Sequence, residues 1–148
     1  MTAVTPAFTE MSKEQFQAHL DERSVNTHDP ARVASFFAVD GRQRRVATGE
    51  AATGRDAIRL AMAETFRGFP DLRVDVRDLF AAGARMCVEV TMTGTHQGEW
   101  RGVPPTNRRI EVELCLVFRF GADGLVEQET VYGDASTMLR QLGLVPEQ

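Results

Sequence analysis

Four stretches decide the fold of this chain: LRVDVRDLFA (72–81), RMCVEVTMTGTH (85–96), RRIEVELCLVFRF (108–120) and VEQETVY (126–132). Within them, apolar residues recur at alternate positions, which is the pattern of a strand with one buried face. Gly, Pro, Asn and Asp residues separate the stretches, as turns between strands require. The segment therefore predicts four strands of a mostly antiparallel sheet.

Helical signals surround these strands. Capping residues or a helical spacing of apolar residues predict helices at 12–26, 29–41, 55–69 and 135–142, the last capped by Asp134. A short strand is predicted at 43–48, followed by a turn-rich connector at 49–54. We expect residues 1–11 to form a loose N-terminal arm and residues 12–148 a single domain. This order of elements predicts an α+β fold with helices on one face of the sheet.

Composition restricts the class of protein. The 148 residues are 43% hydrophobic and 26% charged, as in one globular domain large enough to enclose a small-molecule pocket. The net charge of -4 argues against binding to nucleic acid. We find no secretory signal and no apolar run of 18 residues, so we expect no membrane association and a cytoplasmic protein. Cys87 and Cys115 are then expected to be buried, reduced thiols.

Six spaced motifs carry a family resemblance: GRDAI (54–58), FPDL (69–72), TGTHQG (93–98), GVPPTNR (102–108), FRFGADG (118–124) and QLGL (141–144). Over residues 12–145 the chain resembles the SnoaL-like polyketide cyclases, part of the nuclear-transport-factor-two-like superfamily that includes ketosteroid isomerases and limonene epoxide hydrolase. The resemblance implies a cone-shaped α+β barrel, in which a curved sheet and helices on its concave face enclose an apolar pocket. It also implies homodimers paired through the outer sheet face. The implied reaction is an intramolecular aldol ring closure started by a carboxylate, without a metal or organic cofactor.

Strand alternation predicts which side chains line this pocket. In the third strand of the segment, Leu116 and Phe118 belong to the apolar face that we expect to point inward. In the last strand we expect Glu127 and Glu129 to point outward, because isolated carboxylates are costly to bury. This choice predicts that three polar side chains point into an apolar cavity, where they could orient a ligand. They are those of Gln128, Thr130 and Tyr132.

The catalytic acid and base are less well defined. The family's aspartate in the last strand and histidine in the strand before it correspond to Thr130 or Val131 and to Leu116, so neither residue is matched. Asp134 is the best remaining acid, although helix capping explains it equally; Asp40 and Glu129 are weaker candidates. His96 is the second catalytic candidate, able to form a polar cluster with Tyr132, with structural hydrogen bonding as its alternative role.

Two further residues are candidates for ligand binding. The resemblance implies that the isomerases' base corresponds to a position near Arg44 or Arg45, but a guanidinium stays protonated and cannot accept a proton. Arg45 is the candidate for ligand binding. It either binds an acidic ligand or enolate oxygen, or belongs to a solvated basic rim with Arg42 and Arg44. Trp100 either caps the pocket, contacts a second subunit or packs within its loop. The three histidines lack the spacing of metal ligands, so we expect no metal site.

These observations leave two function hypotheses open. One is a cofactor-independent enzyme resembling polyketide cyclases, acting on an apolar or carbonyl-bearing small molecule. The other is a non-catalytic ligand-binding or auxiliary dimeric module of the same fold, or a relative resembling an epoxide hydrolase or isomerase. We expect a homodimer because the outer sheet face is partly apolar, with these residues: Cys87, Thr91, Thr93, Cys115 and Val117.

Overall fold

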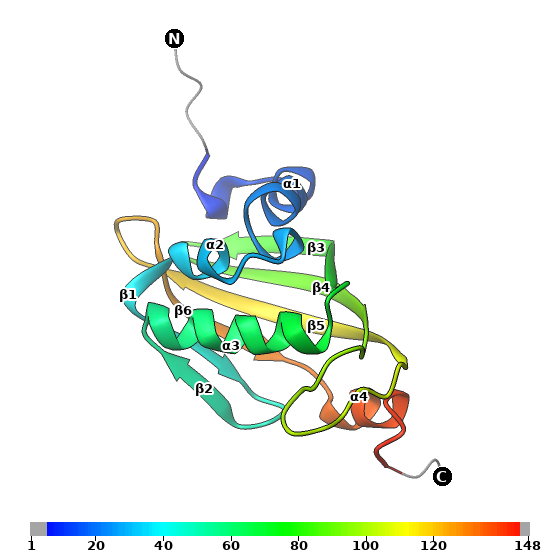
Figure 1. The fold of residues 1–148 in the computed structure, drawn as a ribbon. Coiled ribbons are helices and arrows are strands. Elements are labelled where there is room, and N and C mark those ends of the chain that lie inside the picture. The colour runs from blue at the N-terminus through cyan, green and yellow to red at the C-terminus, as the bar shows by residue number, and fades with distance from the viewer. Residues whose placement is uncertain (1–5, 146–148) are drawn as a thin grey trace.

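The computed structural model describes residues 6–145 and shows a curved sheet with helices packed on its concave side (Figure 1). The helices are α1 (Lys13–Arg23), α2 (Pro30–Ser35), α3 (Arg55–Gly68) and α4 (Ala135–Gln141), with short 3-10 turns at Phe8–Glu10 and Val25–Thr27. The strands are β1 (Phe37–Arg45), β2 (Glu50–Thr53), β3 (Arg73–Ala82), β4 (Arg85–Thr95), β5 (Arg109–Phe120) and β6 (Val126–Tyr132). The fold class predicted from the sequence is confirmed.

All six strands form one sheet, in the order β2-β1-β6-β5-β4-β3. Every neighbouring pair is antiparallel except β1 and β6, which run parallel. This parallel pair joins the start of the domain to its last strand. Residues more than 80 positions apart in the chain, such as Gln43 and Glu129, therefore lie side by side.

The helix starts follow the predicted capping signals. Ser12 and Gln15 form a reciprocal capping box at α1, and Asp29 accepts hydrogen bonds from the first backbone amides of α2. Helix α3 presents Ile58, Met62 and Phe66 to the core at a helical spacing. The helices predicted at 12–26, 55–69 and 135–142 are thus confirmed as α1, α3 and α4, with ends that differ by at most three residues.

Two predicted boundaries are wrong around β1. The helix expected to reach Gly41 ends at Ser35, and the strand expected at 43–48 begins at Phe37. The connector at 49–54 contains β2, which pairs with β1. Long-range pairing explains both differences: Phe37 pairs with Val126 in β6, and these hydrogen bonds override a local helical preference.

The N-terminal arm lies partly outside the described residues, which begin at Pro6. The part that is described contacts the domain. The ring of Phe8 packs against those of Phe16, Phe36 and Phe120, with centroids 5.4–6.2 Å apart. These aromatic contacts close one end of the space between the helices and the sheet.

No helix within residues 6–145 has the length and apolar character needed to cross a membrane.

Candidate functional site

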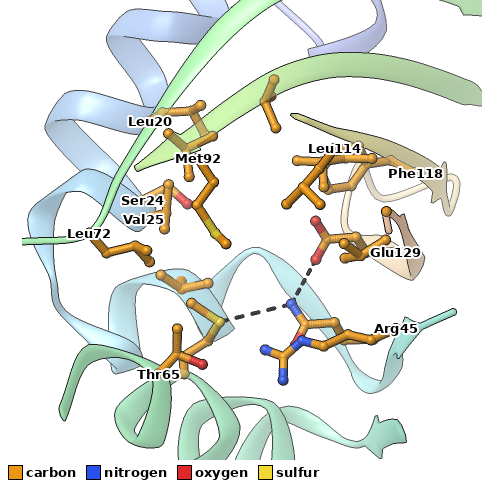
Figure 2. A pocket seen from close by; sticks show the side chains of 18 of the residues that line it. Leu20, Ser24, Val25, Arg45, Thr65, Leu72, Met92, Leu114, Phe118 and Glu129 are labelled. Carbon is orange, nitrogen blue, oxygen red and sulfur yellow. Dashed lines mark hydrogen bonds between the residues drawn. The ribbon is translucent and has the colours of Figure 1, made fainter. Parts of the chain in front are cut away.

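A cavity of about 230 Å³ lies between the helices and the concave face of the sheet (Figure 2). Its walls are mainly apolar. Leu116 and Phe118 of β5 line it, as alternation predicted, together with Val90 and Met92 of β4. Helix α1 contributes Leu20 to the opposite side. The cavity is smaller than the roughly 300–1,000 Å³ typical of sites for drug-sized ligands, so it suits a compact molecule.

A β-bulge decides which residues of β6 face this cavity. Phe120 pairs with Val126, but Arg119 pairs with Gln128, so Glu127 is an extra residue without a partner on β5. A bulge of this kind shifts the alternation by one position. Glu129 consequently lies opposite Phe118 and points inward with it.

The predicted orientation of the last strand is therefore wrong. Gln128, Thr130 and Tyr132 belong to the opposite face, where the amide of Gln128 donates a hydrogen bond to the Thr130 hydroxyl at 3.2 Å. The Tyr132 side chain is 43% exposed. None of the three lines the cavity. The alternation argument assumed an unbroken strand, whereas the bulge at Glu127 reverses the two faces.

Glu129 is the carboxyl group most deeply placed in the cavity wall, with only 7% of its surface exposed. The Gln43 side-chain nitrogen of β1 donates a hydrogen bond to its Oε1 at 2.8 Å. Burial raises the pKa of Glu129 above its usual value, and the Gln43 hydrogen bond and the charge of Arg45 offset only part of that rise. A carboxyl group in this setting exchanges a proton nearer neutral pH than a solvated one does.

Gln43 was not singled out by the sequence, and Glu129 only as a weak candidate. Gln43 is itself buried, and its side-chain nitrogen also lies 3.9 Å from the Met62 sulfur of α3. These contacts fix the amide beside the carboxyl group. No local signal in β1 or β6 reveals this pairing, because it depends on the parallel register of the two strands.

Arg45 lines the cavity from β1, which agrees with one of the two roles that the sequence left open for it, a residue facing the ligand. Its neighbour Arg44 pairs with Thr130, and Arg42 pairs with Gln128, on the other face of the sheet. A single basic rim of all three arginines is therefore absent from the structure. Burial lowers the pKa of Arg45, and the charges of Glu129 and Glu64 partly offset this effect.

Trp100 also lines the cavity, from the loop between β4 and β5. Its ring packs edge-on against Phe69, with centroids 5.5 Å apart, and the Arg101 guanidinium lies 5.0 Å from the indole centroid. Arg101 forms an ion pair with Glu50 at the end of β2. These contacts hold the loop against the cavity wall.

Asp134 borders the cavity but is fully engaged as the N-cap of α4. Its carboxylate accepts hydrogen bonds from the Ser136 amide at 2.9 Å and from the hydroxyls of Ser136 and Thr137 at 2.8 Å. The Thr137 and Ser136 hydrogen bonds lower the pKa of Asp134. This direction agrees with helix capping and is opposite to that needed by a neutral-pH proton acceptor.

His96 is completely buried and does not line the cavity. Its ring stacks on Phe69, with centroids 5.3 Å apart, and its Nδ1 accepts a hydrogen bond from the Thr106 amide at 3.2 Å. The Nε2 atom has no hydrogen-bond partner within the described chain. Because Tyr132 lies on the outer face, the predicted His96–Tyr132 cluster does not form.

Within residues 6–145, no group of three or more His, Cys, Asp or Glu side chains is arranged to hold a metal ion.

Comparisons with solved structures support the fold. A SnoaL-like protein from Jannaschia sp. CCS1 aligns over 97% of this chain and 100% of its own, with 21% identity and a TM-score of 0.75. IdmH from Streptomyces antibioticus, provisionally assigned as a polyketide cyclase, aligns over 90% of this chain and 99% of its own, with 27% identity and a TM-score of 0.70. AclR from Streptomyces galilaeus, provisionally assigned as a hydroxylase, aligns over 90% of this chain and 84% of its own, with 26% identity and a TM-score of 0.71.

No curated protein sequence matches the chain significantly. The profile of the SnoaL-like polyketide cyclase family, in contrast, matches residues 15–142, which is most of the chain. The motif resemblance, the fold and this match agree with one another. The chain therefore belongs to the SnoaL-like polyketide cyclase family.

Proposed function

We propose that this protein is an acid/base enzyme that closes a ring in a small carbonyl compound by an intramolecular aldol reaction, with Glu129 moving the proton. The observation that carries the proposal is the Glu129 carboxyl group, buried in an apolar cavity and hydrogen-bonded to Gln43. Burial raises its pKa toward the range in which a carboxylate is an effective general base near neutral pH. Membership of the cyclase family supports the reaction class.

The proposed reaction needs no external reagent. The ionised Glu129 removes a proton from a carbon that lies between or beside carbonyl groups, and the substrate delocalises the resulting negative charge. The enolate carbon attacks a second carbonyl of the same molecule and forms the new carbon–carbon bond. The oxygen of that carbonyl then takes the proton back from Glu129, so the product is an isomer of the substrate.

The other cavity residues have binding roles in this proposal. Gln43 is a positioning residue, because its hydrogen bond fixes the orientation of the Glu129 carboxyl group. Leu116, Phe118 and Trp100 contact the apolar part of the ligand. We assign Asp134 to helix capping and His96 to packing beside the loop rather than to the reaction.

Proton exchange from a model carbon acid tests the central step. We suggest 2-tetralone, a compact two-ring ketone, with deuterium incorporation in D₂O followed by NMR. The wild-type protein is expected to accelerate exchange above the buffer rate, and Glu129→Gln to reduce the protein-dependent rate by about 100-fold or more. Glu127→Gln is the matched control, since Glu127 is exposed and paired with Arg119 outside the cavity.

Two results would overturn the proposal. Wild-type protein that gives no exchange above buffer, at concentrations where 2-tetralone binds, would favour a non-catalytic ligand-binding module. Equal rates for wild type and Glu129→Gln would remove Glu129 from the reaction. Circular dichroism and melting curves establish that both variants are folded before their rates are compared.

We also propose that a second copy of the chain covers the outer sheet face. Cys87 and Cys115 are free, partly buried thiols on this face, with their sulfur atoms 3.0 Å apart. The exposed Tyr132 ring lies on the same face and is a residue type enriched at interfaces. Sedimentation velocity is expected to show a dimer at micromolar concentrations; a monomer at all of them would contradict this proposal.

A further inference from the structure

Arg45 is an arginine whose charge has no direct partner in the cavity wall. Within residues 6–145, no carboxylate oxygen lies within 4 Å of its guanidinium, and its side chain makes no hydrogen bond to the protein. Some arginines do contact a carboxylate within this distance, among them Arg73, Arg101 and Arg119. A guanidinium carries five N–H donors, so Arg45 offers several unused donors to the cavity.

The charged groups near Arg45 do not contact its guanidinium directly. Its guanidinium stays protonated at any physiological pH. The charges of Glu129 and Glu64 act on it from a distance, without an ion pair within 4 Å. Glu64 is exposed, and its carboxylate accepts the backbone N–H of Arg101 at 3.3 Å. The charge of Arg45 in turn lowers the pKa of Arg101, after a larger effect of burial, so a second cation lies nearby. Arg101 is paired with Glu50, whereas Arg45 has no carboxylate in contact within the described residues.

The remaining titratable groups at the cavity do not change this balance. Burial, and then the charge of Arg23, lower the pKa of His19 to about 4, so its imidazole is neutral near pH 7. Asp134 directs its carboxylate to the N-terminal end of α4, at the cavity border. A neutral, apolar ligand that filled the cavity would separate the Arg45 donors from water without replacing their hydrogen bonds, which is unfavourable.

We propose that the ligand of this cavity is a compact carboxylic acid, whose carboxylate is bound by Arg45 while its apolar body lies against β4 and β5. A carboxylate matches the fork of a guanidinium and forms two parallel, charge-assisted hydrogen bonds with it. Glu129 then lies close to the anchored end of the ligand (Figure 2). The cavity volume of about 230 Å³ favours a body of one or two rings.

This inference rests on the proposed function for the identity of the site and adds the charge of the substrate. The carboxylate takes no part in the bond changes described above and remains on the product. Its binding to Arg45 fixes the position of the neighbouring carbon relative to Glu129. Arg45 is thus a specificity-determining residue for the same reaction.

Calorimetric binding of two matched probes, 2-naphthoate and its neutral analogue 2-naphthamide, tests the inference without requiring turnover. Wild-type protein is expected to bind the naphthoate at least about 10-fold more tightly. Arg45→Gln is expected to weaken naphthoate binding by about 10- to 100-fold and to change naphthamide binding by less than about twofold. Arg45→Lys is expected to recover part of the loss. Arg44→Gln, the adjacent arginine on the other face of β1, is the charge-matched control and should leave both affinities unchanged.

Three outcomes would overturn the inference: equal wild-type affinity for the two probes, no detectable naphthoate binding at millimolar concentration, or an unchanged preference in folded Arg45→Gln. The wild-type comparison decides the question even if Arg45→Gln does not fold. The variant Glu129→Gln separates this inference from the proposed function. If Glu129→Gln keeps the preference for naphthoate and the wild type shows no proton exchange, only the catalytic proposal fails. If the wild type exchanges protons but shows no preference for the carboxylate, only the present inference fails.

Discussion

The side-chain nitrogen of Gln43 lies 2.8 Å from Oε1 of Glu129, across the parallel pair formed by the first and last long strands. The two residues are 86 positions apart in the chain, and both are buried. This hydrogen bond lowers the pKa of Glu129, against the larger rise caused by burial. The contact therefore sets both the direction and the basicity of the carboxyl group.

Removal of the Gln43 amide is expected to raise the pKa of Glu129 further. Because the proposed reaction uses the ionised carboxylate, the rising limb of the pH–rate profile for 2-tetralone exchange should move to higher pH in Gln43→Leu. At pH 7 the rate should fall about 10-fold, consistent with loss of a hydrogen bond to a charged group. Gln128→Leu, on the outer face of β6, serves as the control and should leave the profile unchanged. A lower rate with an unshifted profile would assign Gln43 a purely structural role.

The buried Glu129 predicts a specific pH dependence of stability. Its folded-state pKa is raised above the unfolded value, so the folded state binds more protons than the unfolded state between the two pKa values. The contribution of this group to the free energy of unfolding must therefore decrease as pH rises through that window. Glu129→Gln removes this loss, and its melting temperature should exceed that of wild type by a larger margin at pH 8 than at pH 5. A constant margin across pH would show that the pKa of Glu129 is not raised.

His19 predicts the opposite pH dependence at lower pH. Its pKa falls from 6.5 to about 4 in the folded protein, so the unfolded chain binds more protons between these values. Stability should therefore decline as pH falls from 6.5 to 4, by about 1–2 kcal/mol from this group after allowance for its partial exposure. The neutral variant His19→Gln should lose that part of the decline in denaturant unfolding curves. An NMR titration of the His19 ring with a midpoint above 6 would contradict the prediction.

Asp134 is expected to matter for stability and not for proton exchange. Asp134→Ala should lower the melting temperature at pH 7 because it removes the cap of α4, whereas Asp134→Ser should retain most of it. The pKa of Asp134 is lower in the folded protein than in the unfolded chain. The stabilisation is therefore fully present above the unfolded-state pKa and is lost as pH falls through the folded-state pKa. The deficit of Asp134→Ala should therefore shrink in acid.

Exchange rates separate this capping role from catalysis. Folded Asp134→Asn and His96→Ala variants should each exchange 2-tetralone within about twofold of the wild-type rate, since neither side chain is proposed to touch the ligand. A loss of about 100-fold in either variant would return that residue to the reaction.

Much of the fold was predictable from local sequence. Capping residues located the starts of α1 and α2, and alternation in β5 correctly placed Leu116 and Phe118 on the concave face. Prediction was only partly right at residues 36–53, where β1 and β2 form: the strand expected at 43–48 overlaps the end of β1, but the first residues of β1 were assigned to a helix and β2 to a connector. These segments carry weak local signals, and their extended backbone depends on hydrogen bonds to strands far along the chain.

The site was predicted only in part. Arg45 and Trp100 were named as candidates for ligand binding, with other roles left open for each, and the structure places both in the cavity wall. Glu129 was placed on the wrong face, and with it the polar groups of β6 were misassigned. The argument that an isolated carboxylate is costly to bury is sound, but Glu129 is not isolated: Gln43 and Arg45 lie beside it.

The sequence by itself determined the family, the α+β class and the apolar character of the pocket, because these depend on composition, periodicity and motifs that are local in the chain. Only the tertiary structure decided which carboxyl group enters the cavity. That choice depends on one extra residue, Glu127, in the pairing of β5 with β6, and on the parallel register that brings Gln43 to Glu129. Strand register is set by the packing of whole elements, so a one-residue bulge reverses inside and outside without a change in the local pattern.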